Sequence, residues 1–108
     1  MMNVVLSGKF EKEAKRLIRK YQSAAGEIAG LIAELKVTPN LGTPIGRQCY
    51  KIRLSIKSKG KGKSGGARVI TCVVSVKETV VLLSIYDKSE TEDISEIVLR
   101  KLLEENSL

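Results

Sequence analysis

Histidine and tryptophan are absent from the 108-residue sequence, and the aromatic residues are limited to one phenylalanine and three tyrosines. The lack of histidine excludes the side chain that enzymes use most often as a general acid or base near neutral pH. The shortage of aromatic residues means that a hydrophobic core has to be built mainly from valine, isoleucine and leucine. Because 43% of the residues are apolar and fall in periodic runs, we expect one folded domain over residues 1–108.

Cysteines and long apolar runs are also scarce. The two cysteines, Cys49 and Cys72, match no zinc-ligand spacing and no C-x-x-C motif, so we expect them to be small buried thiols. Only three consecutive apolar residues precede Ser7, which is too few for a secretory signal, and no later run approaches membrane-spanning length. These features predict a cytoplasmic protein with no membrane partner.

Acidic residues are missing from one long segment. Residues 35–77 hold ten basic side chains and no acidic one, whereas residues 1–34 have a net charge of +2 and residues 78–108 a net charge of −5. Such a segment creates a positive local field to which a polyanion would respond. A solvated basic surface that keeps the domain soluble is the simpler explanation, and the charge alone does not decide between the two.

Hydrophobic periodicity predicts seven elements in the order β-α-α-β-β-β-α. The first strand covers residues 3–6, and Ser7 is placed to cap the helix that follows. Ser23 opens a second helix, which is expected to end near Val37 because Pro39 disfavours helical backbone in the residue before it. The two adjacent amphipathic helices are expected to form a helical hairpin.

The second half of the chain is expected to be mainly strands. Residues 38–46 contain both prolines and two glycines, which predicts a loop before these strands. The fold class is therefore α+β, with the helical hairpin and a C-terminal helix packed on a mainly antiparallel sheet. The three later strands cover residues 48–56, 67–76 and 79–86.

The last helix is expected to begin at Ser89, with Glu92 three residues later completing a capping box. The acidic residues of its first turn imitate a calcium-binding loop, but Glu92 takes the place that needs glycine and Val98 the place that needs glutamate. Acidic residues in a first turn complement the helix dipole, so no metal site is expected. The apolar stripe of this helix is expected to contain Ile94, Ile97, Val98 and Leu102.

Alternation along residues 48–56 gives this strand an apolar face and a polar face. Lys51 and Arg53 lie on the polar face, and Arg68 opens the next strand. In a hairpin centred near residues 60–61, Arg53 lies across from Arg68 and Lys51 lies one pair further along, so three cations share one face of the sheet. Like charges across a strand pair are destabilising, and their concentration here favours a binding function.

The stretch SIKSKGKGKSGGARVI, residues 55–70, alternates lysine with glycine and serine between these two strands. Gly62-Lys63-Ser64 imitates the end of a phosphate-binding Walker A loop. However, Lys57 stands where that motif needs a glycine, and a strand follows where it needs a helix. A connection between two strands does not need four lysines. Lysines spaced by glycine and serine suit flexible contacts to phosphates that do not depend on the base sequence.

Three segments together resemble the RelE/ParE superfamily of bacterial toxins: YKIRL (residues 50–54), SKGKGKSGGARVI (residues 58–70) and LLSIYDKSE (residues 82–90). The long lysine-glycine insertion is similar to the HigB-like branch. The resemblance implies a RelE-like fold and the toxin of a type II toxin–antitoxin pair, which acts as a ribosome-dependent, metal-independent endoribonuclease on mRNA and needs no cofactor. The implied partners are the ribosome, mRNA and a cognate antitoxin, expected to be a helix-turn-helix protein.

The resemblance also assigns roles to individual residues. Arg68 matches the arginine that contacts the scissile phosphate, Lys51 and Arg53 match two basic positions on the preceding strand, and Lys88 and Tyr86 match active-site positions after and at the end of the last strand. Without histidine, Lys51 is the candidate base because neighbouring cations disfavour its charged form, and Arg68 is the candidate clamp for the transition state. Lys88 or Tyr86 is the candidate acid. Contacts to the RNA backbone are assigned to Arg47, Lys57, Lys59, Lys61 and Lys63.

Three alternatives remain open at this stage. Members of the ParE branch inhibit DNA gyrase and lack the ribonuclease's catalytic set, so the presence of Lys51, Arg53 and Arg68 argues against that activity. A non-catalytic module of the double-stranded-RNA-binding type would bind phosphates through its last helix, which here is mainly acidic. A folded but inactive toxin is the third alternative.

Overall fold

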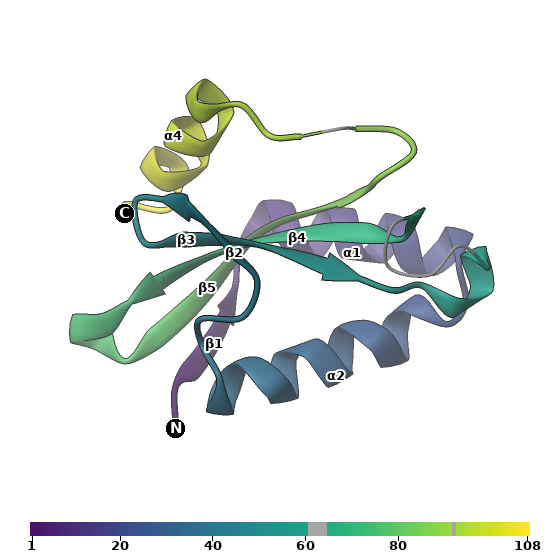
Figure 1. The fold of residues 1–108 in the computed structure, drawn as a ribbon, viewed down its shortest axis with the longest axis horizontal. Helices are drawn as coiled ribbons and strands as arrows, with labels where there is room; N and C mark the ends of the chain where they lie inside the picture. The colour runs from purple at the N-terminus through teal and green to yellow at the C-terminus, as the bar shows by residue number, and fades with distance from the viewer. Residues whose placement is uncertain (61–64, 92) are drawn as a thin grey trace.

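A computed structural model describes residues 1–60, 65–91 and 93–108 of the chain. Its centre is one five-stranded sheet with the strand order β1-β5-β4-β3-β2 (Figure 1). Strand β1 runs parallel to β5, and the other neighbouring strands are antiparallel. The expected α+β class is confirmed. The strands are β1 (Asn3–Leu6), β2 (Thr43–Gly46), β3 (Cys49–Leu54), β4 (Ala67–Val74) and β5 (Thr79–Asp87).

Helices cover both faces of the sheet (Figure 1). Two of them pack side by side on one face, and the C-terminal helix packs on the other. Strand β5 belongs to both hydrophobic cores, because Val80 and Leu82 face the helix pair whereas Val81 and Leu83 face the C-terminal helix. A run of four apolar residues, such as residues 80–83 here, is typical of a strand that is covered on both sides. The helices are α1 (Gly8–Lys20), α2 (Ala24–Val37) and α4 (Glu96–Glu105).

The first two helices begin where the sequence predicts, and the second also ends where it predicts. The hydroxyl of Ser7 accepts a hydrogen bond from the backbone N–H of Phe10 at 3.1 Å and donates one to the carbonyl of Leu83 at 3.0 Å. This serine therefore caps α1 and also ties the helix to β5. Helix α2 begins after Ser23 and ends at Val37.

Residues 38–46, predicted to be a loop, contain the edge strand β2. The prediction gave too much weight to the two prolines. An edge strand tolerates proline because one side of the strand has no neighbour to which an N–H must donate. Pro44 lies opposite Tyr50 of β3, and a register shift follows before Gly46 pairs with Cys49.

The predicted start of the last helix is also wrong, because α4 begins at Glu96 and not at Ser89. Asp87 binds both the backbone N–H and the hydroxyl of Ser89, at 2.9 and 2.7 Å, and holds this serine in a turn after β5. The actual cap is Ser95, whose hydroxyl accepts from the N–H of Val98 at 3.2 Å. Glu92, the other half of the predicted capping box, lies outside the described residues.

The buried stripe of α4 differs accordingly from the predicted one. Ile97 and Val98 are 74% and 46% exposed. The residues that pack against the sheet are Leu99, Leu102 and Leu103.

Both cysteines are free and buried, as expected, and Cys49 of β3 lies directly opposite Cys72 of β4 beneath α4. None of the helices in the described residues is long and apolar enough to span a membrane.

Candidate active site

The register of the β3–β4 hairpin places Arg53 directly opposite Arg68, as its sequence predicts. The N–H of Val73 donates to the carbonyl of Gln48 at 2.9 Å, five pairs away along the same two strands. Hydrogen-bonded and non-hydrogen-bonded pairs alternate in antiparallel sheets, so the Arg53–Arg68 pair is of the non-hydrogen-bonded kind, in which cross-strand side chains lie closest.

On its other side Arg68 lies opposite Tyr86 of β5, so Arg53, Arg68 and Tyr86 form a row across three neighbouring strands. Strand alternation puts Lys51 on this face too, two residues from Arg53. Ile70 and Cys72 of β4 have the same orientation as Arg68 and pack under α4. The predicted catalytic residues of β3, β4 and β5 therefore start from one face of the sheet, the face that α4 partly covers.

Arg68 is buried, with 4% of its surface exposed, and one of its guanidinium nitrogens donates to the carbonyl of Ala67 at 3.1 Å. A buried arginine in a fixed position keeps its charge and its planar set of donors.

The hydroxyl of Tyr86 is buried and has no hydrogen-bond partner among the described residues. Burial raises the pKa of this hydroxyl and the negative charge of Asp93 adds to the effect, whereas the charge of Arg68 and the polar backbone at Ile94 act in the opposite direction. Tyr86 is therefore held in its protonated form, and a buried donor without a partner can be satisfied by a bound ligand.

Asp93 forms an ion pair with one of the cations of this face, Lys51. Its carboxylate accepts a hydrogen bond from the ammonium of Lys51 at 2.8 Å. The hydrogen bond and the charge of Lys51 lower the pKa of Asp93, and the charges of Lys88 and Arg68 lower it further. We name Lys51, Arg68, Tyr86, Lys88 and Asp93 the Asp93 site.

Asp93 is not among the site residues predicted from the sequence, because the acidic run has the pattern of a helix's first turn. Residues 93–95 are not helical, and Asp93 contacts Lys51 of β3. A possible signal in the sequence was the position of this acid shortly after the predicted catalytic residues Tyr86 and Lys88.

Two hollows, each of about 250 Å³, meet at Asp93. Lys51 borders the first and Tyr86 borders the second, and Ser95 at the start of α4 borders both. The N-terminus of a helix favours an anion in such a place. Lys51, Tyr86 and Asp93 of the Asp93 site therefore border hollows that a ligand could enter.

Two predicted residues lie outside this cluster. Arg53 is exposed and borders a different hollow, of about 350 Å³, together with Glu27 and Glu34 of α2. Arg47 is in the turn between β2 and β3, where it forms an ion pair with Glu96 at 3.2 Å. Both side chains remain exposed to solvent.

Lys59, predicted to bind RNA, forms an ion pair with Asp87 at 2.5 Å, and only 5% of its side chain is exposed. Burial alone would raise the pKa of Asp87, but hydrogen bonds from Lys59, Ser89 and Tyr21 hold it well below its usual value. The charge of Lys59 is thus engaged inside the protein. Lys57 is exposed, and the remaining predicted loop lysines, Lys61 and Lys63, lie outside the described residues.

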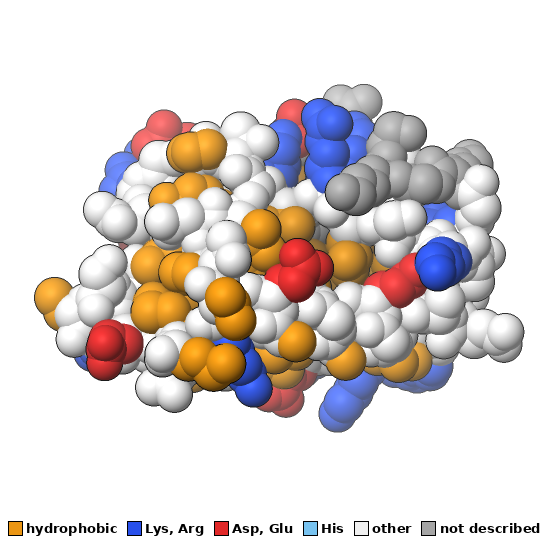
Figure 2. Space-filling view, turned by 60° about the horizontal axis from the view of Figure 1, so that its bottom comes forward, with side chains coloured by type: hydrophobic (Ala, Val, Ile, Leu, Met, Phe, Trp, Pro, Cys, Tyr) orange, Lys and Arg blue, Asp and Glu red, His pale blue; other side chains and the backbone are white. Residues whose placement is uncertain are grey.

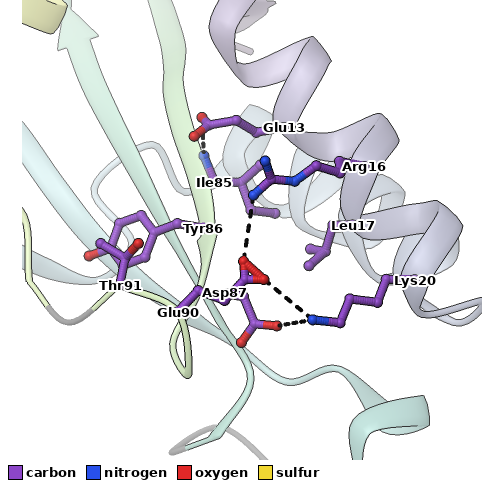
Figure 3. Close-up of a pocket in the computed structure, with 9 residues that line it drawn as sticks. All are labelled: Glu13, Arg16, Leu17, Lys20, Ile85, Tyr86, Asp87, Glu90 and Thr91. Atoms are coloured by element: carbon purple, nitrogen blue, oxygen red, sulfur yellow. Dashed lines mark hydrogen bonds and ion pairs between the residues drawn. The ribbon is translucent and has the colours of Figure 1, made fainter.

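A further cavity, of about 90 Å³, lies between α1 and the end of β5 (Figure 3). Glu13 accepts hydrogen bonds there from the hydroxyl of Ser84 at 2.8 Å and from the N–H of Ile85 at 3.2 Å. Arg16 and Lys20 form ion pairs with Glu90 at 3.5 and 3.3 Å. The charged side chains of this cavity already pair with one another. These contacts hold α1 against the end of β5, and the cavity does not resemble a substrate site.

The searched family models do not match this sequence. Among solved structures, the isolated RelE toxin of E. coli is similar over 100% of both chains, with a TM-score of 0.63 and 18% identity. The E. coli RelBE toxin–antitoxin complex matches with a TM-score of 0.61 and 18% identity, over 81% of this chain and 96% of that one. A metal-bound toxin from Helicobacter pylori matches with a TM-score of 0.54 and 16% identity, over 83% and 98% of the two chains. The chain therefore has the fold of RelE toxins, and the assignment to the HigB-like branch stays a prediction.

Proposed function

We propose that this protein is the toxin of a type II toxin–antitoxin pair and that it cuts mRNA on the ribosome. The observation that supports this function best is the ion pair of the Asp93 carboxylate with Lys51 at 2.8 Å, at a carboxyl group whose pKa the charges of Lys88 and Arg68 lower further. These three cations come from β3, from β4 and from the segment after β5. A site that holds one carboxylate in this way can hold a phosphodiester of RNA instead.

The proposed reaction is attack of the ribose 2′-oxygen on the adjacent phosphorus. The new 2′-O–P bond gives a 2′,3′-cyclic phosphate, and the bond to the 5′-oxygen breaks. Arg68 contacts two phosphate oxygens with its planar guanidinium and stabilises the negative charge of the transition state. Lys88 adds positive charge at the same phosphate.

Two proton transfers complete the reaction. Tyr86 gives its proton to the leaving 5′-oxygen, a role that suits a hydroxyl held in its protonated form. Lys51 takes the proton of the 2′-hydroxyl. Because an ammonium cannot act as a base, Lys51 has to leave the Asp93 carboxylate and give one proton to solvent before it takes the proton of the 2′-hydroxyl.

The proposed dependence on the ribosome follows from the small number of catalytic functions that this site provides. Cations and one tyrosine stabilise charge and move protons, but they do not bend the RNA into the geometry that in-line attack requires. A ribosome that holds the mRNA in that geometry supplies the missing positioning. In this proposal Arg47, Arg53, Lys57, Lys61 and Lys63 contact the RNA backbone, and Lys59 anchors the start of the lysine-rich segment through Asp87.

A cognate antitoxin is the expected protein partner, and we propose that it blocks the Asp93 site. The support is the RelE fold together with the similarity to RelE in its complex with RelB. The protein is expected to act in the cytoplasm, where translating ribosomes are found.

The test is primer extension on an mRNA incubated with purified protein, with and without active translation. Wild-type protein should produce new 5′ ends only on translated mRNA. Arg68→Lys keeps the charge of this buried side chain but loses its planar fork, and should reduce cleavage by about 10²-fold or more. Glu105→Gln, which changes an exposed residue at the end of α4, is the matched control.

Circular dichroism and thermal melting establish that the Arg68 variant is folded. Cleavage by a folded Arg68→Lys protein at the wild-type rate would show that the site is wrong. Failure of the wild-type protein to cut mRNA, combined with loss of gyrase supercoiling activity in its presence, would identify a gyrase inhibitor instead.

A further inference from the structure

The outer face of α1 is uniformly basic. Six of the 13 residues of this helix are lysine or arginine. At about 100° per residue, all six fall within an arc of roughly 140° that is centred opposite the buried residues Phe10, Ala14 and Leu17. The helix's two acidic residues, Glu11 and Glu13, lie at the two borders of this arc. The six basic residues are Lys9, Lys12, Lys15, Arg16, Arg19 and Lys20.

Half of these basic residues have acidic partners. Lys9 pairs with Glu13 at 3.4 Å, and Arg16 and Lys20 pair with Glu90 at 3.5 and 3.3 Å. The three paired residues lie along one border of the basic arc, and the pairs of Arg16 and Lys20 connect α1 to the segment after β5 (Figure 3).

The other half, Lys12, Lys15 and Arg19, have no ion pair within the described residues and are exposed. We name them the α1 basic surface. Their spacing of three and four residues places them in one row, about 10 Å long, on the side of the helix that faces solvent.

Solubility alone does not explain this row. Like charges three or four residues apart destabilise a helix, and the α1 basic surface has two such pairs. Helix α2 lies in the same layer of the fold and has a single basic residue, Lys36, at its end. Its exposed positions include alanines and glycines. In the view that brings the side of α2 forward, hydrophobic side chains form a band across the middle, and Lys and Arg lie mainly towards the margins (Figure 2).

We propose that the α1 basic surface is a second RNA-binding surface, which takes the backbone phosphates of a folded RNA. This proposal rests on the proposed function, since a protein that cuts mRNA on the ribosome has to dock on ribosomal RNA. Lysine and arginine at helical spacing contact phosphates without reading the base sequence.

Lys12, Lys15 and Arg19 border neither hollow of the Asp93 site, although Lys9 and Glu13 of the same helix border the second one. Helix α1 covers one face of the sheet and α4 partly covers the other (Figure 1). A single-stranded substrate in the Asp93 site therefore leaves α1 free to contact a second RNA segment. Arg16 and Lys20 connect α1 to Glu90, two residues after Lys88, so the two surfaces are held in a fixed relation.

An anionic membrane is a poorer partner for this helix. A helix that binds at a membrane surface inserts an apolar face beside its basic one. The apolar residues of α1, including Phe10, Ala14 and Leu17, are buried against the sheet.

The experiment compares two triple variants of the full chain that lose the same charge. The test variant is Lys12→Gln/Lys15→Gln/Arg19→Gln. The control is Lys36→Gln/Lys77→Gln/Arg100→Gln, which changes three exposed residues elsewhere. Binding to purified ribosomes is measured by co-sedimentation at several salt concentrations. Binding to a short single-stranded RNA with a 2′-deoxy linkage reports the Asp93 site separately.

The test variant should bind ribosomes about tenfold or more weakly than wild type, and the slope of log affinity against log salt concentration should fall by about 2. Its affinity for the short RNA should match that of the control, and its melting temperature should not fall, because like-charge repulsion is relieved.

Equal ribosome binding by the two triple variants would overturn this inference, because the affinity would then depend on the net charge of the protein and not on the α1 basic surface. Loss of binding to phosphatidylglycerol vesicles without loss of ribosome binding would also overturn it and identify a lipid surface as the partner. If wild-type protein itself neither binds ribosomes nor cuts translated mRNA, the proposed function fails, and this result differs from either outcome above.

Discussion

Asp93 and Lys51 form an ion pair at 2.8 Å across a gap of 42 residues in the sequence. The aspartate is exposed, whereas the lysine side chain is mostly covered, with 22% of its surface exposed. The same carboxylate lies in the field of Arg68 and Lys88. In the proposed mechanism a phosphate oxygen of the substrate takes the place of this carboxylate, so the free protein holds an anion of its own at the proposed catalytic position.

Asp93→Asn should strengthen RNA binding. The substitution removes a charge that competes with phosphate for the cations of the Asp93 site and keeps the shape of the side chain. We expect affinity for a short 2′-deoxy-substituted RNA to rise about two- to fivefold, the modest effect typical of an exposed ion pair. Fluorescence anisotropy measures it, with Glu105→Gln as the control for net charge.

The pH dependence of this effect follows from the pKa of Asp93. Hydrogen bonding and charge from Lys51 lower it, so the ion pair exists above the usual carboxyl range and is lost only as pH falls through the lowered value. The advantage of Asp93→Asn should therefore persist from about pH 8 to about pH 5. Equal or weaker binding by Asp93→Asn would show that Asp93 positions Lys51 for the substrate and does not compete with it.

Tyr86→Phe should abolish most of the cleavage without weakening the fold. If Tyr86 supplies the proton to the leaving oxygen, its loss should slow single-turnover cleavage on translating ribosomes by about 10²- to 10⁴-fold. Stability should stay the same or rise, because the substitution removes a buried hydroxyl that has no partner in the described residues. Urea denaturation measures that stability.

The pH profile of the wild-type enzyme offers a second check on Tyr86. Burial raises the pKa of this hydroxyl, so the proton donor should remain competent above pH 10, the usual tyrosine value. Wild-type-like cleavage by Tyr86→Phe would reject Tyr86 as the acid and leave Lys88 in that role.

The sheet register could be predicted from the sequence because it depends on local signals. Alternation fixes which side chains share a face, and the Arg53–Arg68 pairing follows from the centre of the hairpin. The cap of α1 by Ser7 is similarly local, since both partners lie within one helical turn.

The start of α4 and the role of Asp93 could not be predicted in the same way. Ser89 has the chemistry of a helix cap, but Asp87 binds it first, and Asp87 is held in place by Lys59 and Tyr21 from distant parts of the chain. Asp93 meets Lys51 only because the following helix starts later than its capping signal indicates. Both features depend on tertiary contacts that no local pattern records.

The corrected position of α4 predicts a clear contrast between two leucine-sized residues. Leu102 is 3% exposed and packs against the sheet, whereas Ile97 is 74% exposed. Leu102→Ala should lower the free energy of unfolding by about 2–4 kcal/mol. Ile97→Ala should change it by about 0.5 kcal/mol or less. Urea denaturation distinguishes them, and similar losses for both would mean that Ile97 is buried and that the predicted stripe is the correct one.

Lys59→Ala should destabilise the protein strongly, because it leaves the carboxylate of Asp87 buried without its cation. The two side chains are 5% and 4% exposed, and breaking a buried pair from one side costs about 3–5 kcal/mol. A variant that replaces both charges, Lys59→Met/Asp87→Leu, should recover much of this loss, since neither buried charge remains. The free energies of unfolding from urea titrations measure both effects.

Acid unfolding tests the same pair independently. The pKa of Asp87 is lower in the folded protein than in the unfolded chain, so the pair stabilises the fold above about pH 4 and this contribution is lost as pH falls through the lowered value. Wild-type stability should therefore decline steeply below about pH 4, and the double variant should show a flatter profile there. If Lys59→Ala instead weakened RNA binding while leaving both stability and its pH profile unchanged, Lys59 would be an RNA contact, as the sequence alone predicts, and the buried pair would have no structural role.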